Sequence, residues 1–184
     1  KGIREDVKTG ASISGNRSGC GPVWFWWCGR KGEDGYAKLW HMLYDRLVNF
    51  HQLNNLIWVF NGNEVKEGVA NYADFYPGHD LVDVLATDVY SGRYDEENYR
   101  QLTQLAGEKP IGLGEIGPLP PLNILQAQPR WAWFMSWRDP DNFYWNNESA
   151  QLRELFAQPH VLSLDGLPWV KLPNDIKIHH PILE

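Results

Sequence analysis

Lys109-Pro-Ile-Gly-Leu-Gly-Glu-Ile-Gly-Pro118 is a short apolar stretch that contains one carboxylate close to its end. Pro110 is typical of the start of a strand and Pro118 of its end, while isoleucine and leucine supply the apolar character. A lone Glu at the carboxyl-terminal tip of a buried parallel strand is where α/β barrels place catalytic groups. The alternative is that Glu115 is a loop carboxylate that caps the next helix. The stretch alone does not separate these two interpretations.

The composition is that of a globular protein with an acidic balance. The chain has 184 residues, of which 43% are hydrophobic and 22% charged, which suits one domain with a sizeable core. The 17 basic and 23 acidic residues give a net charge of −6, which argues against a nucleic-acid or anionic-membrane partner. The apolar runs are strand-sized, so no membrane-spanning segment is predicted. Cys20 and Cys28 lack a metal-site pattern, and no phosphate loop or dinucleotide fingerprint occurs, so we expect no metal and no cofactor.

Aromatic residues are unusually frequent and clustered. Ten Trp, eight Tyr and seven Phe make 14% of the chain, and many lie in two runs, 24–27 and 131–137. Flat amphipathic rings stack on the C–H faces of sugars while polar groups bind the hydroxyls. An aromatic core is the alternative, and it is the better interpretation for any single Trp. It does not account for four consecutive aromatic residues, because neither a strand nor a helix buries every side chain of such a run on one face.

Apolar periodicity predicts helices and strands in alternation. Apolar residues at three- and four-residue spacing predict a helix over 34–50, and a continuous apolar run predicts a strand over 56–60. Residues 61–63 (Asn-Gly-Asn) are then expected to form a turn. Further strands are predicted over 82–90, 111–115 and 131–137, and further helices over 65–76, weakly, and over 95–106 and 151–157.

Strands that are apolar on both faces and alternate with helices predict a parallel sheet with helical crossovers. A closed eight-stranded barrel typically needs about 250 residues, and this chain offers four strands of that kind. The sequence therefore predicts an α/β fold that is part of a (β/α)8 TIM barrel.

Several blocks of the sequence together form a recognisable pattern of order and spacing: 22–29, 38–40, 55–60, 76–80, 82–83, 88–90, 114–117 and 131–137. In this order and spacing they resemble glycoside hydrolase family 26. That family contains mainly endo-β-1,4-mannanases on a (β/α)8 barrel. The resemblance implies a retaining hydrolase of β-1,4-mannan, with a polysaccharide or oligosaccharide as its partner. It runs over 22–184 and implies the carboxyl-terminal half of the catalytic domain, barrel strands five to eight with their helices.

The resemblance also implies roles for particular residues. Glu115 matches the nucleophile, which attacks the anomeric carbon, and Tyr90 matches the tyrosine that keeps this carboxylate oriented and ionised. Trp137 matches the tryptophan under the sugar at the cleavage site, Arg138 a polar contact one sugar further out, and Trp24 an aromatic residue that lines the cleft. The alternatives are core packing for Tyr90 and Trp137 and a solvated loop charge for Arg138. An extracellular or periplasmic location is implied as well, although the chain opens without a signal-peptide pattern.

Three other polar residues near the predicted strand ends receive no catalytic role. Asp83 and Asp88 are expected to be structural hydrogen-bonding groups, and His79 is left unassigned.

One departure from the family pattern concerns the general acid/base. In the family it is a Glu preceded by His, five residues before the first Trp of the aromatic run, where this chain has Ser18 and Gly19. No Glu or Asp lies between Asp6 and Trp24. A general acid supplies a factor of about 10²–10⁴, so we expect poor hydrolysis of mannan. We hypothesise that 1–21, an irregular segment unlike the family, comes from a truncated or frame-shifted gene.

Two other functions remain open at this point. One is a non-catalytic carbohydrate-binding remnant that keeps the aromatic residues. The other is a related specificity for β-glucan or β-xylan. An open half-barrel also exposes edge strands and apolar surface, which predicts self-association.

Overall fold

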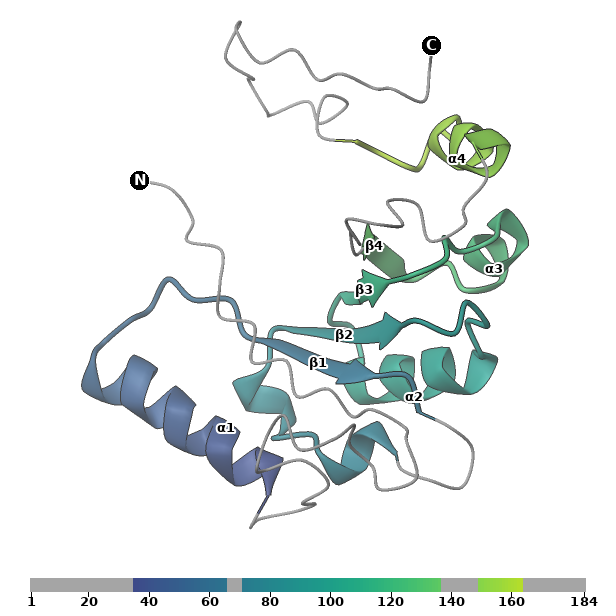
Figure 1. Ribbon diagram of the computed structural model, residues 1–184. Helices are drawn as coiled ribbons and strands as arrows, with labels where there is room; N and C mark the ends of the chain where they lie inside the picture. Colours follow the sequence, from purple (N-terminus) through teal and green to yellow (C-terminus); the bar gives the residue numbers. More distant parts are fainter. Residues whose placement is uncertain (1–34, 66–70, 137–148, 164–184) are drawn as a thin grey trace, which may run out of the picture.

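The computed structural model describes residues 35–65, 71–136 and 149–163. At its centre is a four-stranded sheet in the order β1-β2-β3-β4, and every neighbouring pair is parallel (Figure 1). The predicted parallel sheet is therefore confirmed. The strands are β1 (Val59–Asn63), β2 (Val84–Val89), β3 (Ile111–Ile116) and β4 (Trp131–Ser136).

Helical segments precede, connect and follow the strands, and the longer ones match the predicted ranges. The helix predicted over 34–50 is confirmed from Tyr36, although its second half is a π-helix, and the helices predicted over 95–106 and 151–157 are also confirmed. Within the described part of 65–76 the structure has only one short 3₁₀ turn, η3. The segments are α1 (Tyr36–Tyr44), η2 (Asp45–Phe50), η3 (Tyr72–Asp74), η4 (His79–Leu81), α2 (Glu96–Ala106), α3 (Leu122–Ala127) and α4 (Ser149–Phe156).

The prediction for β1 was wrong in its bounds. The strand was expected over 56–60 with a turn at 61–63, but it extends over Val59–Asn63. Its register with β2 runs from Val59 opposite Val84 to Asn63 opposite Asp88. Pairing with the neighbouring strand, not apolar composition, therefore decides where β1 ends. Just before the strand, the Trp58 N–H donates to the Asp83 carboxylate at 2.7 Å, and the Trp58 carbonyl accepts from the backbone N–H groups of Asp83 and Val84.

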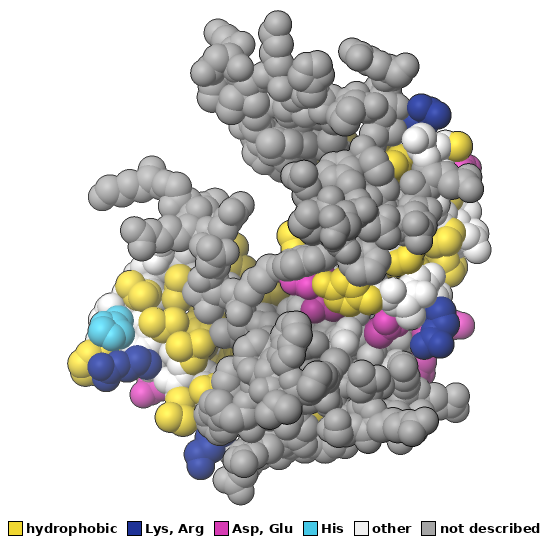
Figure 2. All heavy atoms as spheres, in the orientation of Figure 1, with side chains coloured by type: hydrophobic (Ala, Val, Ile, Leu, Met, Phe, Trp, Pro, Cys, Tyr) yellow, Lys and Arg dark blue, Asp and Glu magenta, His cyan; other side chains and the backbone are white. Residues whose placement is uncertain are grey.

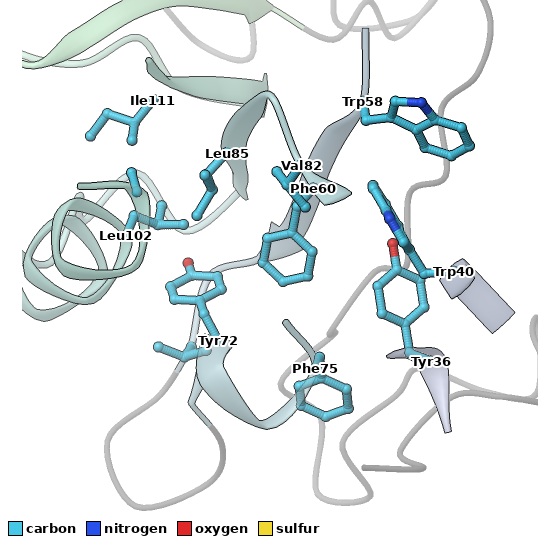
Figure 3. Packing of buried hydrophobic residues seen from close by; sticks show 12 residues of the cluster. Tyr36, Trp40, Trp58, Phe60, Tyr72, Phe75, Val82, Leu85, Leu102 and Ile111 are labelled. Carbon is cyan, nitrogen blue, oxygen red and sulfur yellow. The ribbon is translucent and has the colours of Figure 1, made fainter. Parts of the chain in front are cut away.

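Two hydrophobic clusters fill the space between the sheet and the helices. The first packs aromatic side chains of α1 and β1 against α2, and Tyr36, Trp40 and Phe60 make edge and tilted ring contacts (Figure 3). The second, on the same side of the sheet, joins the carboxyl-terminal parts of β2 and β3 to α3 and α4. Within each strand, the members of these clusters mark the side of the sheet that faces the helices. These members are Phe60 of β1, Leu85 and Val89 of β2, and Ile111, Leu113 and Ile116 of β3.

A buried polar group ties α2 to the sheet. The Tyr72 hydroxyl lies 2.6 Å from the Thr87 hydroxyl and donates to the side-chain oxygen of Asn98 at 2.8 Å. Asn98 also accepts from the Val65 N–H at 2.7 Å and donates to the Val65 carbonyl at 3.3 Å. The residues that follow β1 are thus fixed to the first turn of α2, close to the carboxyl end of the sheet.

Candidate active site

The alternation of side chains along the strands decides which side of the sheet the polar residues of the site face. In β2, Leu85, Thr87 and Val89 face the helices, so Asp88 and then Tyr90 face the opposite side of the sheet. Because parallel strands end at the same edge, residues near the ends of neighbouring strands come together. Asp88 lies opposite Glu115 in the pairing of β2 with β3.

Glu115 reaches this side of the sheet because of an irregularity in β3. Strict alternation from Ile111 and Leu113 would turn Glu115 toward the helices. The register slips by one residue at Gly114, since Thr87 pairs with Leu113 and the next residue, Asp88, pairs with Glu115. Ile116 therefore joins the helix-side cluster, and both Gly114 and Glu115 remain on the opposite side. β-Bulges commonly re-aim a side chain in this way.

A direct hydrogen bond joins the two residues that the sequence assigned to the reaction centre. The Tyr90 hydroxyl donates to a Glu115 carboxylate oxygen (Oε2) at 2.5 Å. Burial first, and then the hydrogen bond to Glu115 and the charges of Glu115 and Asp88, raise the pKa of Tyr90 well above its ordinary value. The phenol therefore stays protonated and remains a donor to the carboxylate at neutral pH.

The alternative role for Glu115, capping the next helix, is not supported. Helix α3 begins after Pro121, and no side chain caps its first turn. Glu115 is half-buried and hydrogen-bonded across the sheet to Tyr90 instead. Such a carboxylate is oriented and still reachable from solvent, as a nucleophile must be.

Asn61 and Asp88 support the site from the strand side. The Asn61 amide donates to the Asp88 carboxylate at 2.9 Å, and Asp83 accepts from the Trp58 backbone, so both aspartates have the structural roles expected of them. The Asn61 side chain lies where a side chain at position 114 would be, since a Cβ on Gly114 would be 2.0 Å from its Oδ1. Gly114 is therefore needed for close approach of an amide, not for its backbone angles.

Aromatic and apolar side chains of β4 border the same side of the sheet. Trp133 is 36% exposed and Met135 38%. A Cβ on Gly112 would lie 2.4 Å from the Trp133 ring, so this glycine leaves room for the indole. Figure 2 shows acidic side chains next to hydrophobic ones near the middle of the displayed face, with Lys and Arg at its periphery. A partly exposed indole is a surface on which a sugar ring can stack.

Sequence reasoning missed Glu64, which directly follows β1. Its carboxylate accepts hydrogen bonds from the backbone of Tyr90 and Ser91 and from the Ser91 hydroxyl. The pattern that indicated Glu115, an acidic residue at the end of an apolar strand, applies to Glu64 as well. Because 61–63 was assigned to a turn, the predicted strand ended at residue 60 and Glu64 was not recognised as lying at its end.

The remaining predicted site residues, Trp24, Trp137 and Arg138, lie outside the described residues, as do Ser18 and Gly19. Among 35–65, 71–136 and 149–163, no three His, Cys, Asp or Glu side chains gather in a way that could hold a metal ion. In the same ranges, no helix combines the length and apolar character needed to cross a bilayer.

The parallel sheet, its helical crossovers and the carboxylate at the strand ends define part of an α/β barrel with an acidic site. Comparison with known proteins gives the family: the model described as "Glycosyl hydrolase family 26" matches residues 19–166, and the chain belongs to that family.

Individual relatives agree with this assignment. A mannan endo-1,4-beta-mannosidase of Thermothelomyces thermophilus is 40% identical over 150 residues, which are 78% of this chain and 29% of that protein. Mannan endo-1,4-beta-mannosidase A of a Piromyces species is 31% identical over 79% of this chain and 23% of its own length. The chain thus spans about a quarter to a third of the length of the curated relatives it matches.

Solved structures show the same fold. GH26A from Muricauda sp. MAR_2010_75 superposes with a TM-score of 0.69 at 49% identity, over 79% of this chain and 48% of that one. The Podospora anserina GH26-CBM35 beta-(1,4)-mannanase superposes with a TM-score of 0.62 at 37% identity, over 79% and 32% of the two chains. The predicted partial α/β barrel is therefore confirmed.

Proposed function

We propose that this chain carries the nucleophile half of a retaining β-mannanase, with Glu115 as the nucleophile and Tyr90 as the residue that orients it. The observation that supports this most strongly is the 2.5 Å hydrogen bond from Tyr90 to Glu115 at the carboxyl end of β3. The second support is the name shared by the relatives, mannan endo-1,4-beta-mannosidase.

The chemistry follows from a protonated phenol beside a carboxylate. Tyr90 binds one oxygen of Glu115 (Oε2) and so orients the carboxylate, whose second oxygen (Oε1) is the nucleophile under this proposal. That oxygen attacks the anomeric carbon and forms a glycosyl ester, while the bond to the leaving group breaks and the leaving group departs with the electron pair. A good leaving group needs no proton from a general acid, so this step depends on the nucleophile alone.

A carbohydrate-binding protein without turnover is the second candidate. It is favoured by Ser18 and Gly19, which stand where the family pattern has His and Glu. Under either function we place the protein outside the cytoplasm, extracellular or periplasmic, because polymeric mannan does not cross a membrane. Residues 22–184 would form the family-like part of the domain and 1–21 a separate irregular segment.

Covalent labelling separates the two candidates. The chain is incubated with a 2-deoxy-2-fluoro mannoside that carries a dinitrophenolate leaving group, and intact mass and peptide mapping then locate any adduct. We expect the label on Glu115 and none in Glu115→Gln, whereas Glu108→Gln, an exposed carboxylate after α2, should label like the parent. Absence of label in a folded chain would favour sugar binding without catalysis.

Self-association through the edge strands β1 and β4 stays a prediction. Light scattering on the purified chain tests it, and a monodisperse monomer would contradict it.

A further inference from the structure

Glu64 is a buried carboxylate that contacts the segment carrying Tyr90. It is 9% exposed and directly follows β1. One of its oxygens (Oε1) accepts from the backbone N–H groups of Tyr90 at 3.2 Å and Ser91 at 2.9 Å, and the other (Oε2) accepts from the Ser91 hydroxyl at 2.5 Å. Hydrogen bonds to an ionised acceptor are roughly twice as strong as neutral ones. These contacts therefore compensate much of the cost of burying the charge.

The backbone of Glu64 is itself fixed from two directions. Its N–H donates to the carbonyl of Asp88 at 2.9 Å, which ties it to β2. The next residue, Val65, is bonded through both its N–H and its carbonyl to the Asn98 side chain in α2. Glu64 is thus attached to two regular elements, so its carboxylate is a fixed point to which the segment after β2 is bonded.

The segment after β2 needs such a fixed point, because its backbone has unusual conformations. Gly92 has a φ of 69° and Tyr94, which is not a glycine, a φ of 51°. A non-glycine residue in the left-handed region persists only where its surroundings hold it there. Tyr94 is held at the far end of the segment, since its hydroxyl donates to the Pro118 carbonyl and its own carbonyl accepts from Gln128 at 2.9 Å. Glu64 holds the near end.

We infer that Glu64 is a positioning residue for the nucleophile: by binding the amides of Tyr90 and Ser91, it fixes the place from which the Tyr90 hydroxyl donates to Glu115. The chain of contacts runs from Glu64 to the Tyr90 backbone, and from the Tyr90 phenol to the Glu115 carboxylate. The consequence for glycosyl transfer rests on the proposed function, whereas the positioning of Tyr90 does not.

The simpler alternative is that Glu64 only stabilises the fold. Both roles predict a lower melting temperature when Glu64 is removed, so stability does not distinguish them. They differ in what happens at Glu115 in the folded protein. A displacement of a reacting group by about 1 Å can cost a factor of about 100 in rate, whereas a purely structural role leaves the rate of the folded fraction unchanged.

A double-mutant cycle with Tyr90→Phe tests the inference by the rate of covalent labelling, measured well below the melting temperature of each variant. We expect Glu64→Ala to label at least tenfold more slowly than the parent. We expect Glu64→Gln, which keeps a planar group with an acceptor oxygen, to recover most of that rate. In the Tyr90→Phe background, where no phenol remains to be positioned, Glu64→Ala should cost less than about twofold. Equal losses in both backgrounds would overturn the inference.

A second measurement keeps the inference testable if the parent chain takes up no label and the proposed function fails. With 13C-labelled tyrosine, the ring-carbon resonance of Tyr90, assigned by its loss in Tyr90→Phe, is followed from pH 7 to 11. In the parent, burial and the facing carboxylates Glu115 and Asp88 raise the pKa of this phenol, so it should stay protonated. In Glu64→Ala it should ionise nearer pH 10, as a free tyrosine does. An unchanged Tyr90 resonance over this range in folded Glu64→Ala would overturn the inference.

Discussion

At the amino end of the sheet charged side chains bind the backbone, whereas at the carboxyl end polar side chains also bind one another. At the amino end, the Lys109 ammonium donates to the carbonyls of His79 and Val82. Asp83 at the same end accepts from the Trp58 N–H. Each of these contacts joins a side chain to the main chain of a neighbouring connection, so this end fixes the path of the chain between its elements.

At the carboxyl end, contacts between side chains connect one strand to the next. Asn61 of β1 donates to Asp88 of β2, and Tyr90 after β2 donates to Glu115 of β3. The series ends on a half-buried carboxylate. Under the proposed function, the amino end of the sheet therefore contributes stability and the carboxyl end carries the chemistry, a division that α/β barrels show in general.

Lys109→Met and Tyr90→Phe should separate the two ends most clearly. Losing hydrogen bonds from a charged donor costs about 2 kcal/mol, so Lys109→Met should lower the free energy of unfolding by that amount without changing the labelling rate of Glu115. Tyr90→Phe should do the reverse and slow labelling by about tenfold or more while changing stability little. Urea unfolding and labelling are measured on both variants. Slower labelling of Glu115 in Lys109→Met would show that the two ends of the sheet are not independent.

Gly114→Ala should disturb both stability and chemistry, because its Cβ would lie 2.0 Å from the Asn61 oxygen and 3.1 Å from an Asp88 oxygen. Overpacking of this kind costs about 1–3 kcal/mol. Shortening Asn61 to Ala in the same chain makes room for the methyl group. We therefore expect Asn61→Ala/Gly114→Ala to be more stable than Gly114→Ala alone, as measured by urea unfolding. If the losses in free energy of unfolding of the two single variants simply add up in the double variant, the two side chains do not compete for the same space.

Tyr72→Phe should give the smallest effect, a change in how the free energy of unfolding depends on pH that is visible only at alkaline pH. Burial raises the pKa of Tyr72 well above its ordinary value of 10.0, so the folded state keeps a proton that the unfolded state loses above pH 10. Its contribution to stability is complete below pH 10 and is lost as the pH rises further, by at most about 1.4 kcal/mol per pH unit. The free energy of unfolding should fall less steeply between pH 10 and 11 in Tyr72→Phe than in the parent. Parallel slopes would contradict this.

The sequence predicts the larger elements because their patterns are local. Helix α2 has apolar residues on one face over eleven positions, and the buried strands are short apolar runs between turn signals. The six-residue helix α3 was not predicted, since it spans too few turns for periodicity to appear. The end of β1 was misplaced because Asn61 and Asn63 look like turn residues, and only their pairing with β2 makes them part of a strand.

The candidate site was predicted only in part, because local patterns indicate its residues but not the contacts between them. Glu115 and Tyr90 could be placed because each follows an apolar run and matches a family block. The hydrogen bond between them depends on the register slip at Gly114, and no periodicity encodes such a slip. Glu64 makes its contacts 26 and 27 residues away in the chain. A pattern read within one segment does not contain contacts of that kind.

The space that Asn61 and Gly114 share has a consequence for how this sequence can diverge. A lineage that acquires a larger residue at 114 first passes through a crowded, less stable protein, unless position 61 has already become smaller. The reverse order has no such barrier, apart from the lost hydrogen bond to Asp88. These two positions, 53 residues apart, should therefore change in a fixed order. Ancestral intermediates with a small residue at 61 and glycine at 114 are expected. Intermediates with asparagine at 61 and a larger residue at 114 should be rare.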